Sequence, residues 1–231
     1  MNKSIGILGG MGPLATCDLM NKIINHTDAS RDQEYIRICV DCNTNIPDRT
    51  GAILHGGADP LPEMTKSAVR LQAMGADVLV MSCNTAHYFY EQICRFIDIP
   101  MLHMPLETAK YLAEQGVKKA AVLATDGTVQ VGIYDKALKE LGIEPVYPNA
   151  EDQKMVMSLI YDYVKAGKPI TQQAEIKAMV KRLTDAGAET MILGCTELPI
   201  VFAQMDEPQP TVDPTEVLAC AAVKAVGGKL K

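Results

Sequence analysis

Short apolar runs recur along the chain and alternate with segments whose apolar residues follow helical spacing. The apolar runs predict buried strands at 4–9, 36–42, 78–82, 99–103, 119–124, 144–147, 190–193 and 210–213. The helical patterns cover 13–26, 61–74, 85–97, 105–115, 130–141, 151–166, 171–186 and 214–226. Strands that alternate with helices in this way predict an α/β protein with parallel sheets covered on both faces.

An internal repeat divides the chain into two halves. The segments RLQAMGAD at 70–77 and RLTDAGAE at 182–189 each lead through a strand to a cysteine, Cys83 and Cys195, at an offset of 112 residues. Two related halves would place both cysteine turns at the carboxyl ends of parallel strands, where ligands bind. We expect the last strand and helix to return to the first half, which gives domains of 1–98 plus 208–231 and 99–207.

The two cysteines suit one kind of chemistry. Each follows a buried strand at the point where the chain turns, and a helix N-terminus there can lower the pKa of a thiol from its usual value of about 8.5. A lone cysteine would be interpreted as a small buried residue, but two in repeated, polar-flanked turns favour a reaction. A symmetric pair of thiols suits removal of a proton from one face of a carbon and its return to the other, which is racemisation.

Composition narrows the class of protein. The formal net charge of −6 and the pI near 5.3 argue against a nucleic-acid partner, which usually meets a basic face. No apolar segment approaches the length of a membrane span, and the opening apolar stretch runs into a strand-to-helix pattern rather than a signal-peptide cleavage site. The seven cysteines, in a chain too long to need disulfides, are expected to be reduced thiols. We therefore expect a cytoplasmic protein that acts on small molecules.

Seven motifs along the chain resemble the aspartate racemases of the aspartate/glutamate racemase superfamily. They are GILGGMGPLAT at 6–16, RDQE at 31–34, IPDRT at 46–50, SCNTAHYF at 82–89, GIYDKAL at 132–138, IYDYVKAG at 160–167 and GCTEL at 194–198. The resemblance implies two pseudo-symmetric three-layer α/β domains, each with a parallel four-stranded sheet, and an active site in the interdomain cleft. It also implies catalysis without a cofactor and a homodimer.

Glu197, two residues after the second cysteine, favours aspartate as the substrate. Glutamate racemases of the superfamily typically continue from this cysteine with threonine and histidine, whereas this chain has Thr196 and Glu197. The resemblance also implies that Asp48 and Glu197 each lie near one thiol, and it assigns Cys195 to L-aspartate and Cys83 to D-aspartate. Because a carboxylate disfavours a neighbouring thiolate, we expect the reactive thiolate to form mainly in the substrate complex.

A dicarboxylic amino acid needs cations and oriented donors. Arg49, in a proline-bounded loop after a strand, is expected to bind a substrate carboxylate through two hydrogen bonds from its guanidinium group. The resemblance pairs it with Lys165. Met11, in the glycine-rich loop, is expected to line the cleft. The expected hydrogen-bond donors to the substrate are Asn84, Thr85, Thr125, Thr128 and Thr196.

Two motifs suggest other chemistry. Residues 10–15 satisfy the dinucleotide pattern G-x-G-x-x-A, but the acidic residue expected about 20 positions later would be Asp32, which lies before the second strand rather than at its end. Cys39 and Cys42 have C-x-x-C spacing, yet residues three apart on a strand point to opposite faces. We therefore predict core cysteines at these two positions, and likewise at Cys17, Cys94 and Cys220.

The histidines carry a weaker signal. His87, four residues after Cys83, could form a Cys–His nucleophilic pair, although a structural hydrogen bond at the start of a helix is the favoured interpretation. His26, His55 and His103 show no ligand spacing, so we predict no catalytic metal.

Several alternative functions stay open. Within the superfamily they are racemases of glutamate, hydantoin or broad specificity, maleate-type isomerases, and arylmalonate-type decarboxylases, which tend to keep one cysteine. A non-catalytic two-lobed binding protein would show the same fold but have no reason to keep both thiols. A pyridoxal-phosphate racemase would need a phosphate loop coupled to a Schiff-base lysine, a combination that the sequence does not show.

Overall fold

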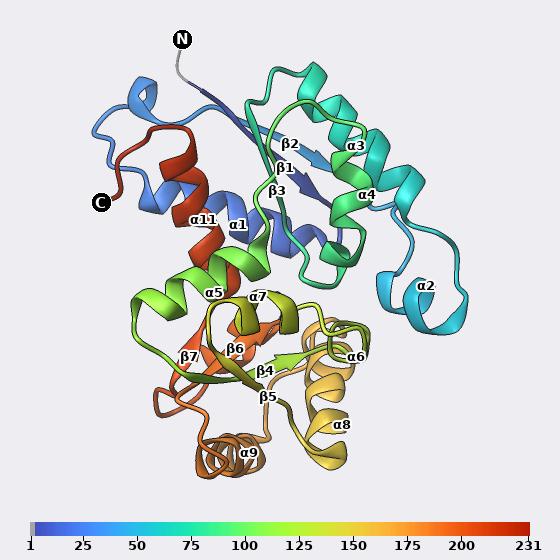
Figure 1. Ribbon diagram of the computed structural model, residues 1–231, viewed down its shortest axis with the longest axis vertical. Coiled ribbons are helices and arrows are strands. Elements are labelled where there is room, and N and C mark those ends of the chain that lie inside the picture. Colours follow the sequence, from blue (N-terminus) through green and yellow to red (C-terminus); the bar gives the residue numbers. More distant parts are fainter. Residues whose placement is uncertain (1–2) are drawn as a thin grey trace. The chain divides into compact units, whose positions relative to one another are not determined.

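The computed structural model describes residues 3–231 and contains two parallel sheets, so the predicted α/β class is confirmed (Figure 1). The chain divides into two compact units. The first comprises the chain up to Glu107 together with Thr215–Lys231, and the second comprises Thr108–Pro214. The boundaries therefore lie somewhat later in the chain than 98 and 207, the positions that the sequence suggested.

The sheet of the first unit has the strand order β2-β1-β3, formed by Ile38–Cys42, Ile5–Gly9 and Val78–Met81. The register pairs Ile5 with both Ile38 and Val78. The expected fourth strand at 99–103 is only an isolated parallel bridge between Leu79 and Met101. Pro100 has no N–H to extend the ladder, so the first sheet has three strands rather than four.

Helices cover both faces of this first sheet (Figure 1). One face packs Ile5 and Ile7 against α1 (Pro13–His26) and α11 (Pro214–Ala225). The other face packs Leu8 and Leu79 against α3 (Leu61–Ala73) and α4 (Tyr90–Cys94). Because successive residues of a strand point to opposite faces, the apolar residues of β1 and β3 serve both layers.

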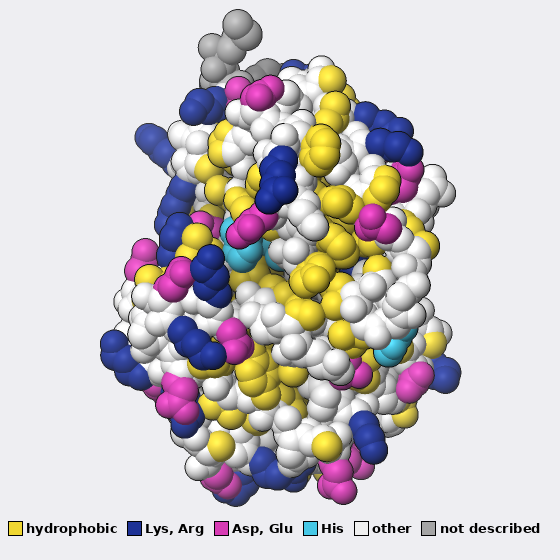
Figure 2. Space-filling model, turned by 45° about the vertical axis from the view of Figure 1, so that its right-hand side comes forward, with side chains coloured by type: hydrophobic (Ala, Val, Ile, Leu, Met, Phe, Trp, Pro, Cys, Tyr) yellow, Lys and Arg dark blue, Asp and Glu magenta, His cyan; other side chains and the backbone are white. Residues whose placement is uncertain are grey.

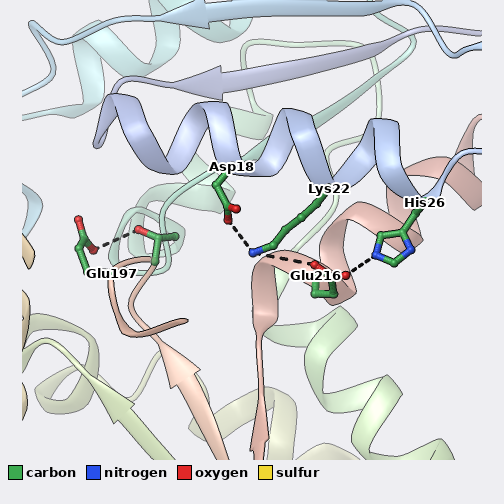
Figure 3. Close-up of polar contacts among 6 residues, drawn as sticks. Asp18, Lys22, His26, Glu197 and Glu216 are labelled. Atoms are coloured by element: carbon green, nitrogen blue, oxygen red, sulfur yellow. Dashed lines mark hydrogen bonds and ion pairs between the residues drawn. The ribbon is translucent and has the colours of Figure 1, made fainter. Parts of the chain in front are cut away.

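Polar contacts join α1 to α11 (Figure 3). Lys22 Nζ lies 2.6 Å from Asp18 Oδ2 and 3.9 Å from Glu216 Oε2. His26, one turn further along α1, also contacts Glu216. Asp18, Lys22 and His26 follow one another at intervals of four residues, so they share one side of the helix. These contacts hold the C-terminal helix against the first unit.

The sheet of the second unit has the order β5-β4-β6-β7, formed by Glu144–Val146, Lys119–Ala124, Thr190–Gly194 and Thr211–Val212. Its large core cluster joins β4 and β6 to α8 (Ala150–Ser158) and α9 (Gln173–Asp185). The prediction that the last strand returns to the first half is wrong, because β7 pairs with β6 of the second sheet. The chain returns to the first unit at Thr215, near the start of helix α11.

Several helices differ from the predicted boundaries. The segment expected as one helix at 130–141 begins at the last residue of α6 (Asp126–Gln130) and is otherwise helical only in α7 (Asp135–Glu140), and Gly132, with a φ of 62°, lies between the two helices. The segment at 151–166 continues from α8 into a π-helical segment, η3 (Leu159–Val164). Helix α5 (Met104–Glu114) crosses the boundary between the units.

The two units repeat the same local geometry. Helices α3 and α9 lie at the same offset as the two cysteines, and each ends before a glycine of positive φ, Gly75 at 88° and Gly187 at 95°. The carboxylates of Asp77 and Glu189 then accept backbone N–H groups near the start of the first strand of their own unit. The turns after β3 and β6 therefore occupy equivalent positions in the two units.

The surface carries both signs of charge. On the face drawn in Figure 2, acidic and basic side chains are interspersed rather than gathered into a field of one sign. Within residues 3–231, none of the helices has both the length and the apolar character that a membrane crossing requires.

Candidate active site

The Cys83 turn follows β3 in the first unit and is held by a buried hydroxyl network. Cys83 is 6% exposed, and Ser82 before it is fully buried. Thr16 Oγ1 accepts the Gly10 N–H at 2.9 Å, donates to Gly12 O at 2.9 Å, and lies 3.1 Å from Ser82 Oγ. Because the single hydroxyl proton of Thr16 is donated to the Gly12 carbonyl, Ser82 is the donor in the contact between the two hydroxyl groups. The network joins the glycine-rich loop to the Cys83 turn.

Packing within the first unit explains the glycine pair of this loop. A Cβ on Gly9 would lie 2.3 Å from Thr16 Cγ2. Gly10 has a φ of 91°, and a Cβ there would lie 2.3 Å from the carbonyl carbon of Asn43. Gly10, the first glycine of the dinucleotide-like pattern, therefore has a structural reason that requires no bound phosphate.

The chain after Cys83 forms a short 3₁₀ helix, η2 (Thr85–Phe89), rather than the start of the expected α-helix. Asn84 and Thr85, both predicted substrate donors, are buried beside Cys83. His87 is 5% exposed, and burial together with the neighbouring His103 lowers its pKa to about 3. Both ring nitrogens of His87 contact backbone groups, which supports the structural interpretation over a Cys–His pair.

Arg49 begins a helix that the sequence did not indicate. It was expected in a loop, but it is the first residue of α2 (Arg49–His55), and the Asp48 carboxylate accepts the Gly51 N–H at 2.6 Å as the N-cap. Arg49 donates to the carbonyls of Pro47 and Met11, each at 3.0 Å. The structure thus joins Arg49 to Met11, and it gives the exposed Asp48 a capping contact.

The Cys195 turn follows β6 in the second unit and contains a thiol–carboxylate pair. Cys195 is 8% exposed, and its Sγ donates to Glu197 Oε2 at 3.0 Å. Thr196 Oγ1 donates to the same oxygen at 3.2 Å. Burial, followed by the negative charge of Glu197 and its hydrogen bond, raises the pKa of Cys195 well above the usual thiol value.

Lys165 lies on the other side of this carboxylate. Its Nζ is 3.9 Å from Glu197 Oε1 and 4.4 Å from the centre of the Tyr161 ring. The π-helical segment η3 delivers it there, because the Lys165 N–H bonds to the carbonyl of Ile160, five residues earlier. The structure therefore brings Cys195, Thr196, Glu197 and Lys165 together, and the lysine charge opposes part of the effect of Glu197 on the thiol.

Thr125 and Thr128 lie at the start of α6, after β4. Thr125 is the N-cap and accepts the Thr128 N–H at 3.4 Å, and the two hydroxyl oxygens are 3.2 Å apart. Both residues are buried. This turn is the second-unit counterpart of the glycine-rich loop, because it follows the first strand of its sheet.

Sequence reasoning missed residues that support the cysteine turns. Thr16 and Ser82 lie inside recognised motifs, but only their hydrogen bonds show their part in the site. Tyr134, in the GIYDKAL segment, is fully buried, and a Cβ on Gly194 would lie 3.3 Å from its ring. The absence of a side chain at Gly194 thus lets Tyr134 pack beside the residue that precedes Cys195.

The other cysteines differ in their burial. All seven cysteines are free thiols. Cys39 is buried as predicted, whereas Cys17 and Cys42 are exposed and Cys94 and Cys220 are half-buried, so the prediction of core positions for these four is corrected. Cys42 ends β2 at its carboxyl end, where the strand leaves the sheet. Over residues 3–231, no group of three or more His, Cys, Asp or Glu side chains is arranged to hold a metal ion.

Comparison with known proteins identifies the family. The model of the Asp/Glu/hydantoin racemase family matches residues 8–222. The chain belongs to this family. The broad specificity amino-acid racemase RacX of Bacillus subtilis is 33% identical over 229 residues, which cover 95% of this chain and 96% of that protein. The resemblance recognised from the seven motifs is confirmed at the level of the family.

Two solved structures of similar proteins have the same fold. Picrophilus torridus aspartate racemase is 32% identical, with a TM-score of 0.82 over 99% of this chain and 96% of that chain. An aspartate racemase homologue from Pyrococcus horikoshii is 25% identical, with a TM-score of 0.79 over 97% of this chain and 99% of that chain. This family member thus shares its fold with racemases over nearly its whole length.

Proposed function

We propose that this protein racemises an acidic amino acid, interconverting L- and D-aspartate without a cofactor, with Cys83 and Cys195 as the two acid/base groups. The observation that carries the proposal is that the two cysteine turns occupy equivalent positions in the repeat. Each follows the strand that comes after one of two helices of the same length, α3 or α9, which occupy equivalent positions in the repeat. Two matching thiols suit a reaction that needs similar acid/base groups on the two faces of one carbon.

The proposed proton transfer starts with one thiolate and one thiol. The thiolate takes the proton from the α-carbon, and the thiol gives its proton to the opposite face, so the two sulfurs exchange roles. Following the family resemblance, Cys195 acts on L-aspartate and Cys83 on D-aspartate. The Cys195 thiol donates to Glu197, which stabilises its protonated form in the free protein. The ammonium group of a bound substrate would favour ionisation of the thiol.

Arg49 and Lys165 are the proposed cations for the substrate carboxylates. Arg49 already presents its planar guanidinium to two carbonyls, and a carboxylate could replace them as a stronger acceptor. We propose that Asp48 assists Cys83 as Glu197 assists Cys195, and that Met11 lines the site. The proposed hydrogen-bond donors to the substrate are Asn84, Thr85, Thr125, Thr128 and Thr196.

A broader substrate range is the second candidate. The similarity to RacX, which is named a broad specificity racemase, favours this candidate, because it extends over nearly the whole length of both chains. The same two thiols would then act on amino acids with other side chains, and only the contacts to the side chain would differ. We further propose, from the family resemblance, that the protein works as a homodimer, and, from its composition, that it works in the cytoplasm.

The test is α-proton exchange in deuterated water. Purified protein is incubated with L-aspartate, D-aspartate and a panel of other amino acids, while NMR follows loss of the α-proton and chiral chromatography follows inversion. We expect inversion of both aspartate enantiomers, with deuterium incorporated at the α-carbon. Inversion of many amino acids at comparable rates would favour the broad-specificity candidate. Failure to invert any of them would overturn the proposed function.

Cysteine variants test the two-base mechanism. Cys83→Ser and Cys195→Ser should both abolish inversion, while each retains slow exchange of the single enantiomer that faces the remaining thiol. The exposed Cys17 supplies the matched control, because Cys17→Ser removes a thiol that lies outside both turns. Full inversion by Cys83→Ser or by Cys195→Ser would contradict the proposed pairing of the two thiols.

A further inference from the structure

We propose that His87 is a positioning residue for the racemisation proposed above, because its neutral imidazole fixes the backbone of Cys83 and so the direction of the thiol. The His87 side chain comes from η2 and lies in the interior of the first unit. Nδ1 lies 2.8 Å from the carbonyl oxygen of Cys83. Nε2 accepts the N–H of Met104 at 3.1 Å.

These two contacts determine the tautomer. The Met104 amide can only donate, so Nε2 of His87 must present a lone pair. The proton of the neutral ring is then on Nδ1, where it is donated to the carbonyl of Cys83. A doubly protonated ring would lose the Met104 contact. The arrangement therefore requires one proton state and one tautomer.

The imidazole replaces a backbone hydrogen bond at the start of the turn. In an α-helix the His87 N–H would bond to the carbonyl of Cys83, four residues earlier. Here the His87 N–H bonds to the carbonyl of Asn84 at 3.0 Å, which gives the first turn its 3₁₀ form. The Cys83 carbonyl is left to the side chain, so rotation of the peptide after Cys83 would break the contact to His87.

The contacts also tie the Cys83 turn to a second element. Met104 is the first residue of α5, 17 residues after His87 along the chain. The rings that face His87 are those of His103, at 5.1 Å in an edge contact, and Tyr90, stacked at 6.3 Å. The hydroxyl of Tyr90 donates to the carbonyl of Met101 at 2.7 Å. His87 thus lies in a packed cluster that leaves its ring little freedom to turn.

Imidazole NMR of the full chain tests the tautomer directly. With ¹⁵N-labelled histidine, we expect one ring in the Nδ1–H form that does not titrate from about pH 5 to about pH 9, and we expect its signals to disappear in His87→Gln. A His87 ring that titrates in this range, or that carries its proton on Nε2, would overturn the proposal. This measurement does not depend on any enzyme activity.

Variants test the positioning role. His87→Leu should lower kcat about 100-fold with little change in KM, the effect expected for a reacting group displaced by about 1 Å. His87→Gln keeps a donor and an acceptor and should recover at least about tenfold of this loss. His55→Leu, at an exposed position, is the control. Equal kcat in His87→Leu and wild type would refute the role, and so would a His87→Gln variant no better than His87→Leu.

Thiol alkylation separates this proposal from the proposed function. We expect His87→Leu to change the alkylation rate of Cys83 severalfold while the rate of Cys195, measured in the same samples, stays constant. If the wild type racemises no amino acid, this ratio and the NMR result still decide the role of His87. If His87→Leu fails to fold, the comparison of His87→Gln with wild type decides it. An unchanged ratio in a folded variant contradicts the proposal.

Discussion

Replacement of Glu197 by glutamine should make the Cys195 thiol easier to ionise. The thiol lies 3.0 Å from the carboxylate oxygen, and a thiolate at that distance would be repelled by about 5 kcal/mol at an effective dielectric constant of about 20. The ammonium of Lys165, 3.9 Å from the other oxygen, offsets part of this repulsion. We therefore expect Glu197→Gln to lower the pKa of Cys195, because the variant removes this repulsion and keeps the charge of Lys165.

The assay is the pH dependence of Cys195 alkylation. Iodoacetamide is used in a Cys83→Ser background, and peptide mass spectrometry follows Cys195 from about pH 7 to about pH 11. Glu207→Gln is the matched control, because it removes the same charge from an exposed side chain of the same unit that pairs with Lys177. The midpoint should move to lower pH in Glu197→Gln and stay in place in Glu207→Gln. A midpoint that stays or rises in Glu197→Gln would refute the electrostatic argument.

Three further predictions concern the first unit. Burial lowers the pKa of His87 from 6.5 to about 3, so between these pH values the unfolded chain takes up a proton that the folded chain does not. Acidification over this range should therefore destabilise wild type more than His87→Gln, by up to about 1.4 kcal/mol per pH unit, as measured by denaturant titrations. Gly10→Ala should lower the free energy of unfolding by more than about 2 kcal/mol. Gly12→Ala should change this free energy little, because a Cβ there would meet no atom within 4 Å. Equal losses in the two variants would contradict the steric argument. Arg49→Lys should lower kcat/KM for aspartate at least about tenfold with an unchanged melting temperature, since an ammonium cannot supply a planar fork, and unchanged kinetics would remove Arg49 from the proposed site.

Much of the fold follows from local patterns. Helix α1 begins and ends at the predicted residues, and β4 spans the predicted strand, because continuous apolar runs and helical spacing are local signals. The repeat could also be predicted, since Gly75 and Gly187 end equivalent helices at a positive φ that glycine adopts without strain. The two cysteine turns could therefore be located from the sequence alone.

Other features depend on partners far along the chain. Pairing of β7 with β6, rather than a return to the first sheet, depends on which strand edge is available. The short helix α2 begins at the Asp48 cap within a motif that looks like a loop, and periodicity cannot detect seven residues of this kind. The exposure of Cys17 and Cys42 likewise depends on what packs over each strand and helix.

By itself, the sequence determined the fold class, the two equivalent cysteine turns and the family. Only the tertiary structure decided the chemical state of the groups around them. Glu197 affects the Cys195 thiol through a contact of 3.0 Å, and His87 is restricted to one tautomer by a carbonyl four residues away and an amide 17 residues away. A pKa and a tautomer depend on burial and on the positions of neighbouring charges and dipoles, and folding sets these quantities in space rather than along the chain.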